Sequence, residues 1–125
     1  MATSDTPPVA IAASPVQFVF DRSGGAVIHA RLSIWSGVDT PNEKRVLVLF
    51  FEDALDDHET FTRALPVGRY SCVLHAFIRE DLRGDYVYEH RAGGRLMAAD
   101  RGQVNVSPAP GDGRVSRHDY VLAVS

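Results

Sequence analysis

A chain of 125 residues with 45% apolar and 23% charged residues is long enough to bury one hydrophobic core, and it fits a single soluble domain. The formal net charge of −3 and the scattered arginines exclude the usual nucleic-acid binder, which gathers a basic excess in one region. Cys72 is the only cysteine, so an intramolecular disulfide is excluded and a reducing compartment is favoured.

The first fourteen residues contain no Lys or Arg, and Pro7 and Pro8 interrupt them. They lack the charged start and the sustained apolar core of a signal peptide or a transmembrane helix. We therefore expect a flexible arm over residues 1–14 and a single domain over 15–125, in a cytoplasmic protein of bacterial type with no membrane contact. A signal peptide already removed would instead make the protein a secreted one.

Apolar and polar residues alternate along most of the remaining chain, which predicts strands and no helix longer than a turn or two. The expected strands, in chain order, are 16–20, 26–35, 45–51, 60–65, 69–79, 86–92, 95–99, 103–106 and 117–124. The continuous apolar run 45–51 suits a strand buried on both faces, or a central strand with one face at an interface. Residues 69–79 and 86–92 are predicted to form a hairpin, with Ile78 opposite Tyr88 and Phe77 opposite Glu89.

Seven to nine short strands, separated by turns at roughly 8–12-residue spacing, predict an all-β antiparallel sandwich of immunoglobulin-like or related Greek-key topology. The segment Leu-Pro-Val-Gly-Arg-Tyr-Ser-Cys, residues 65–72, resembles the turn into the F strand of immunoglobulin-like domains. In those domains a Tyr lies two residues before the Cys, and its hydroxyl binds the corner backbone. The Leu-Pro-x-Gly-x-Tyr turn is also similar to that of transthyretin-like and fibronectin-type sandwiches. No second cysteine precedes Cys72, so the resemblance implies architecture and no functional residue.

Two sets of side chains point away from the predicted core, one from strand 26–35 and one from strand 69–79. They are His29, Arg31, Ser33 and Trp35 in the first set, and His75, Phe77 and Arg79 in the second. Trp and Arg dominate protein–protein hot spots, so a non-enzymatic module that binds a protein partner or a second copy is the leading hypothesis. A glycan stacked on Trp35, in a lectin-like module, is the alternative. Simple solvation of these residues, or a loop lying over Phe77, would explain the pattern without a function.

The acidic segment 52–59 offers carboxylates for Ca²⁺, which takes six to eight oxygen ligands. The candidates are Asp53, Asp56, Asp57 and Glu59. EF-hand spacing is missing, so solvated charge is the simpler interpretation, and we expect no cofactor.

Catalytic residue types occur without catalytic spacing. The five histidines form no close pair of the metal-binding kind, and Cys72 falls on the core face as a small hydrophobe. Ser116, His118 and Asp119 contain the residue types of a catalytic triad, but no nucleophile elbow accompanies them. We therefore expect no enzymatic activity.

Overall fold

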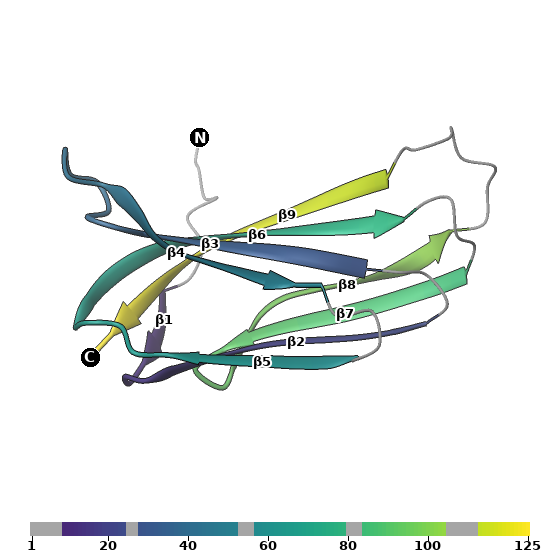
Figure 1. Ribbon diagram of the computed structural model, residues 1–125, viewed down its shortest axis with the longest axis horizontal. Helices are drawn as coiled ribbons and strands as arrows, with labels where there is room; N and C mark the ends of the chain where they lie inside the picture. The colour runs from purple at the N-terminus through teal and green to yellow at the C-terminus, as the bar shows by residue number, and fades with distance from the viewer. Residues whose placement is uncertain (1–8, 25–27, 53–56, 80–83, 105–112) are drawn as a thin grey trace.

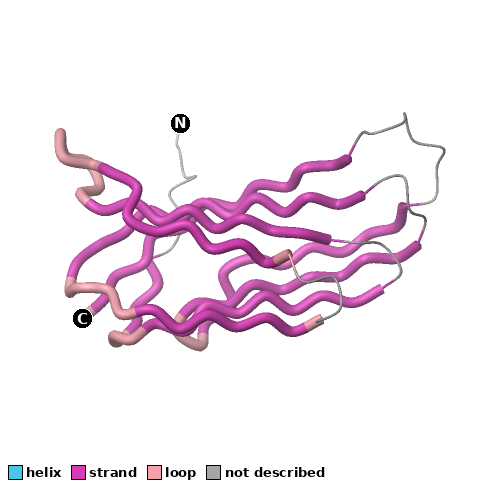
Figure 2. Tube along the Cα trace, in the orientation of Figure 1, coloured by secondary structure: helices cyan, strands magenta, loops and turns pink. Residues whose placement is uncertain are grey.

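The computed structural model describes residues 9–24, 28–52, 57–79, 84–104 and 113–125 (Figure 1). Within these ranges the chain forms nine β-strands and no helix (Figure 2). The strands are β1 (Val9–Ala12), β2 (Val16–Gly24), β3 (Ile28–Ser36), β4 (Lys44–Phe51), β5 (His58–Arg63), β6 (Gly68–Arg79), β7 (Gly84–Ala92), β8 (Arg95–Val104) and β9 (Gly113–Val124). The predicted all-β sandwich is confirmed.

The strands lie in two layers that face each other across the core (Figure 1). The five-stranded sheet has the order β1-β9-β6-β3-β4, and the four-stranded sheet has the order β5-β2-β7-β8. Neighbouring strands are antiparallel except β1 and β9, which run parallel. Only β3–β4 and β7–β8 are consecutive strands within one sheet, because every other connection crosses between the sheets.

Alternation along the strands builds the core as the sequence predicts. Ile28, Ala30, Leu32 and Ile34 of β3 are all at most 2% exposed. Aromatic rings join the two layers, since Phe51 of β4 stacks on Phe20 of β2 at 5.3 Å between ring centroids and also contacts Phe61 of β5. This period-2 burial is the main source of stabilisation, at about 25 cal/mol for each Å² of apolar surface removed from water.

A buried ion pair joins two neighbouring strands of the four-stranded sheet. Arg22 of β2 and Glu59 of β5 are 8% and 9% exposed and bind each other through Nη2 and Oε1. Arg22 Nη1 donates to the carbonyls of Ile28 and Phe51 at 3.0 and 3.1 Å, so the guanidinium reaches from the four-stranded sheet to the five-stranded sheet.

The corner before β6 has the form that the resemblance implies. The hydroxyl of Tyr70 donates to the carbonyl of Pro66 at 2.6 Å, and the Tyr70 ring is buried. Gly68, between them, has a φ of +154°, in the region that favours glycine. This bond fixes the direction in which β6 leaves the turn.

Four expectations about the strands differ from the structure. The predicted hairpin is wrong, because 69–79 lies in β6 between β3 and β9, while 86–92 lies in β7 between β2 and β8. Residues 95–99 and 103–106 were expected as two strands, but 95–104 is the single strand β8.

The other two differences concern the edges of the five-stranded sheet. Residues 9–12 of the expected arm form β1, whose backbone pairs with β9 from Val9 to Ala12. The apolar run 45–51 lies in β4, which is an edge strand and not a central one.

Candidate functional site

The outer face of the five-stranded sheet brings the two predicted residue sets together. Because β3 and β6 pair directly, His29 lies opposite Phe77, Arg31 opposite His75, and Trp35 opposite Ser71. Residues paired across a sheet point to the same face. The sequence therefore identified two parts of one surface, although it did not show that the two strands are neighbours.

The members of this surface differ in exposure. Phe77 is 37% exposed, while His29, Arg31, Trp35 and His75 are half-buried. Ser33 also belongs to the outward set, yet it is only 7% exposed. Arg79 pairs with Gly113 at the end of β6, and its side chain lies outside the described residues.

Neighbouring strands extend this surface with apolar side chains that the sequence analysis did not single out. Phe50 of β4 is 50% exposed and lies opposite Arg31, and Val115 of β9 is 54% exposed and lies opposite Phe77. Val9 and Ile11 of β1 are 43% and 60% exposed at the far edge. Exposed apolar side chains therefore occur on several strands of this face, interspersed with polar and charged ones, and such apolar groups are typical of an interaction site.

The charge of this face is opposite in sign to that of the whole chain. Arginines point outward from β3, β4, β6 and β9. They are Arg31, Arg45, Arg69 and Arg117. Among the described residues of the five strands, Asp119 is the only acid, and it binds Arg117 through hydrogen bonds of 2.9 and 3.1 Å. The exposed Glu52 follows β4 directly. A face with excess positive charge on a chain of net charge −3 favours a partner that carries carboxylates.

Three buried polar atoms on this face have no hydrogen-bond partner within the described chain. They are His29 Nε2, Arg31 Nε and His75 Nδ1. Burial, followed by the positive charges of Arg31 and Arg117, lowers the pKa of His75, so this ring is neutral at pH 7. An orphan atom of this kind costs about 1–3 kcal/mol in the folded protein.

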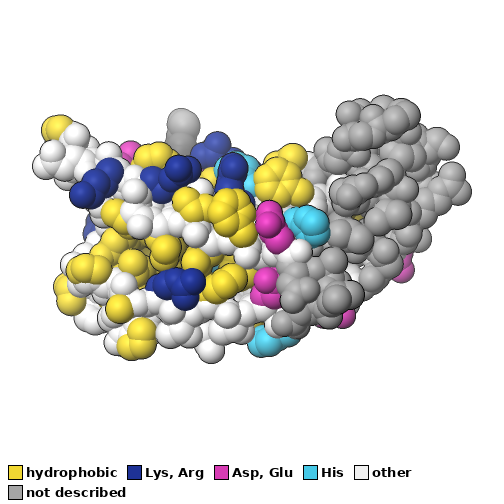
Figure 3. All heavy atoms as spheres, in the orientation of Figure 1, with side chains coloured by type: hydrophobic (Ala, Val, Ile, Leu, Met, Phe, Trp, Pro, Cys, Tyr) yellow, Lys and Arg dark blue, Asp and Glu magenta, His cyan; other side chains and the backbone are white. Residues whose placement is uncertain are grey.

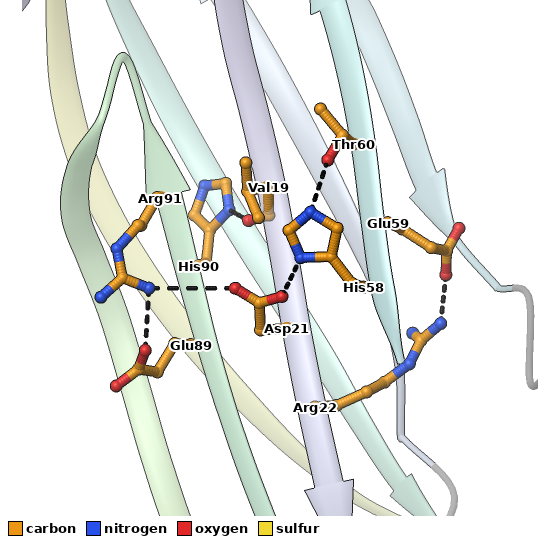
Figure 4. Close-up of polar contacts among 9 residues, drawn as sticks. All are labelled: Val19, Asp21, Arg22, His58, Glu59, Thr60, Glu89, His90 and Arg91. Carbon is orange, nitrogen blue, oxygen red and sulfur yellow. Dashed lines mark hydrogen bonds and ion pairs between the residues drawn. The ribbon is translucent and has the colours of Figure 1, made fainter. Parts of the chain in front are cut away.

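The outer face of the four-stranded sheet has a different character (Figure 4). Arg91 binds Glu89 at 2.8 Å, and its Nη1 lies 3.9 Å from Asp21 Oδ2. Asp21 in turn binds His58, whose second ring nitrogen lies 3.2 Å from the Thr60 hydroxyl. The charges of this face satisfy one another, so the five-stranded sheet is the better candidate for binding.

The interior holds a polar network that sequence reasoning missed. The Tyr88 hydroxyl donates to Ser116 Oγ at 3.0 Å and lies 2.8 Å from His118 Nε2. On the next rung, His90 contacts the hydroxyl of Tyr120 at 2.8 Å. The inward alternation of Tyr and His along β7 and β9 is the signal that could have revealed these contacts.

The Ser, His and Asp side chains near this network are not arranged as a catalytic triad. Ser116 Oγ lies 3.4 Å from His118 Nε2, and the same nitrogen faces Tyr88 at the shorter distance of 2.8 Å. Asp119 points to the opposite face of β9 and binds Arg117, so it cannot orient His118. Buried tyrosine hydroxyls bound to polar partners are what a packed core requires.

The candidate calcium ligands are not assembled in the described part of the chain. Glu59 is held by Arg22 in the interior, Asp57 is exposed, and Asp53 and Asp56 lie outside the described residues. No group of three or more His, Cys, Asp or Glu side chains suited to a metal ion occurs among the residues that the structure describes.

Comparisons with known proteins give no further information about this chain. Neither protein-family models nor curated proteins nor solved structures give a significant match to this chain. The described residues contain no helix long and apolar enough to cross a membrane.

Proposed function

We propose that this protein is a non-enzymatic binding module that contacts a protein partner, or a second copy of itself, through the outer face of the five-stranded sheet. One observation carries the proposal: exposed apolar side chains and outward arginines occur together on that face. The apolar groups supply affinity when they leave water, and the outward arginines supply specificity because they favour a partner of matching charge. The Tyr70 corner supports placing the domain among immunoglobulin-like sandwiches.

Truncation of the face tests the proposal. Trp35→Ala and Phe77→Ala, together with the milder Val115→Ala, should weaken association by about tenfold each if they lie near its centre, while leaving the fold intact. Val87→Ala is the matched control, because Val87 is 39% exposed on the four-stranded sheet. Sedimentation velocity measures self-association, and titration with a purified partner measures the alternative. Unchanged sedimentation together with unchanged partner binding in all three variants would contradict the proposal.

A glycan-binding module is the second candidate, and the surroundings of Trp35 favour it. The half-buried indole has Arg45 and Ser71 as its cross-strand neighbours, so a stacking surface lies beside hydrogen-bonding groups. Trp35 is the only tryptophan, so its fluorescence reports directly on this position. Quenching by sugars, measured with and without EDTA, would support a glycan site and test its calcium dependence. Fluorescence that stays unchanged across a sugar panel would remove this candidate.

A further inference from the structure

We infer that β4 binds an extended peptide segment of alternating apolar and acidic residues, which joins the five-stranded sheet as an additional strand. The inference rests on the proposed function and names the partner of that surface. Strand addition gives affinity through backbone hydrogen bonds and specificity through alternate side chains.

The edge strand itself is the first argument. β4 has the sequence Lys-Arg-Val-Leu-Val-Leu-Phe-Phe and pairs only with β3 in the described chain. An edge strand presents unpaired backbone N–H and C=O groups, and natural proteins shield such edges with bulges and Lys residues. Here a bulge opposite Ile34 and Trp35, together with Lys44, shields the first part of β4. Residues 47–51 contain no bulge and no Lys, and they contain neither Pro nor Gly.

The other edges of the sandwich are less suited to strand addition. β1 has only four residues, and β5 carries the polar sequence His-Glu-Thr-Phe-Thr-Arg. β8 includes Asp100, Arg101 and Gly102, and its pairing with β7 is interrupted by a register shift. β4 is therefore the edge that combines length with an apolar sequence.

The side chains around residues 47–51 indicate which positions of a bound peptide should be apolar and which should be acidic. On the inner side, Leu47 and Phe61 are partly buried hydrophobics packed against the core, so an added strand would bury apolar residues there. Figure 3 shows hydrophobic side chains gathered between β4 and β5, with most of the Lys and Arg side chains on the five-stranded side and some among the hydrophobic ones. On the outer side, Arg31 lies beside Phe50, and Arg45 lies beside Trp35.

The charge of the outer face indicates whether an acidic peptide or a second copy of the chain binds beside β4. Strands in a sheet lie about 4.8 Å apart, so an added strand would lie one spacing from Arg45 on β4 and two spacings, about 10 Å, from Arg31 on β3. Both side chains are long enough to meet carboxylates that lean toward them. A second copy docked through its own β4 would instead bring Arg45 and Arg31 of both copies to the same surface. Like charges at an interface oppose association, so an acidic segment is the occupant that the face favours.

A synthetic octapeptide of four Val-Glu repeats, labelled for fluorescence polarisation, is the direct probe. We expect it to bind about tenfold more tightly than a Val-Lys repeat, or than a peptide with four Val followed by four Glu. Equal affinity for the three peptides would overturn the inference. Two further peptides carry N-methyl groups, one on all the Val amides and the other on all the Glu amides. Because alternate N–H groups of a strand point to opposite edges, each peptide has one edge blocked. Strand addition requires one of them to lose binding while the other retains it, and equal behaviour of the two contradicts it.

Variants of the protein test the charge argument. Arg31→Gln and Arg45→Gln should each weaken binding of the Val-Glu peptide by about two- to fivefold and reduce its salt dependence. Arg101→Gln is the matched control, because Arg101 is exposed on β8 of the other sheet. Unchanged affinity and salt dependence in both face variants would overturn the role of the arginines.

Two results separate a failure of strand addition at β4 from a failure of binding through the outer face. If Val115→Ala weakens binding of a protein partner and no octapeptide binds, the outer face remains the binding surface and strand addition is overturned. If sedimentation shows a dimer that Phe50→Glu abolishes, a second copy occupies this edge, which also overturns the peptide.

Discussion

His90 and Tyr120 lie on opposite sheets and are joined through the core by a contact of 2.8 Å between His90 Nε2 and the Tyr120 hydroxyl. His90 Nδ1 lies 2.8 Å from the carbonyl of Val19, which can only accept, so the ring donates there. In the neutral ring Nε2 is then the acceptor, and the Tyr120 O–H donates to it. Tyr120 also contacts the thiol of Cys72.

This arrangement makes stability depend on pH. Burial lowers the pKa of His90 from 6.5 to about 4, whereas the unfolded chain protonates this group near 6.5. The unfolded state therefore binds more protons between these values, so the contribution of His90 is full above pH 6.5 and is lost as the pH falls toward 4. We expect a loss of about 2 kcal/mol at pH 5 and about 3 kcal/mol at pH 4. Urea unfolding at pH 7, 5 and 4 measures it.

The variant His90→Phe separates this effect from the titration of other groups. It removes the ring that titrates, so the difference between the two proteins in free energy of unfolding should shrink as the pH falls. A difference that stays constant from pH 7 to pH 4 would show that His90 is not the source of the pH dependence.

Cys72 should be inert in the folded protein. The thiol is fully buried, and desolvation raises its pKa to about 12. Because the thiolate is the reactive form, a disulfide reagent at pH 8 should modify Cys72 only as fast as the protein unfolds. The rate should rise to that of a free cysteine in denaturing urea, which serves as the control. Rapid modification without denaturant would show that the core around Cys72 opens far more readily than its burial implies.

The turn between β7 and β8 contains two glycines that should respond differently to substitution. Gly93 and Gly94 have φ values of +59° and +81°, which alanine adopts only with strain. A Cβ on Gly93 would lie 2.7 Å from the Cβ of Ala12, whereas a Cβ on Gly94 has nothing within 4 Å. Gly94→Ala should therefore cost about 1 kcal/mol from the backbone alone, and Gly93→Ala more, because it also displaces β1. Equal losses in thermal unfolding would contradict the role of Ala12.

Local patterns explain which parts of the fold the sequence predicts. The alternation in residues 28–34 reports directly on burial, because successive side chains in a strand point to opposite faces. The Tyr70 corner is equally local, since its donor and acceptor are four residues apart. Both features are readable without knowing which strand lies beside which.

Strand partners are not local, and there the sequence analysis failed. A hairpin between residues 69–79 and 86–92 keeps both faces consistent, yet the observed crossing to the other sheet keeps them equally consistent. Burial alone therefore does not choose between the two. The run 45–51 shows the same limit, because an apolar edge strand and an apolar central strand have the same composition. The candidate surface was accordingly predicted as two separate sets, and its extension to β4 and β9 came from the structure.

The ion pair between Arg22 and Glu59 should be more sensitive to the loss of one partner than to the loss of both. Glu59→Gln leaves the buried guanidinium without a counter-charge, which should cost about 3 kcal/mol of the free energy of unfolding. The double variant Arg22→Met with Glu59→Gln removes the charge as well, so it should recover part of that loss even though the bonds to Ile28 and Phe51 disappear. Urea unfolding of the wild type, both single variants and the double variant forms a complete cycle. Additive losses would show that the two side chains act independently of each other.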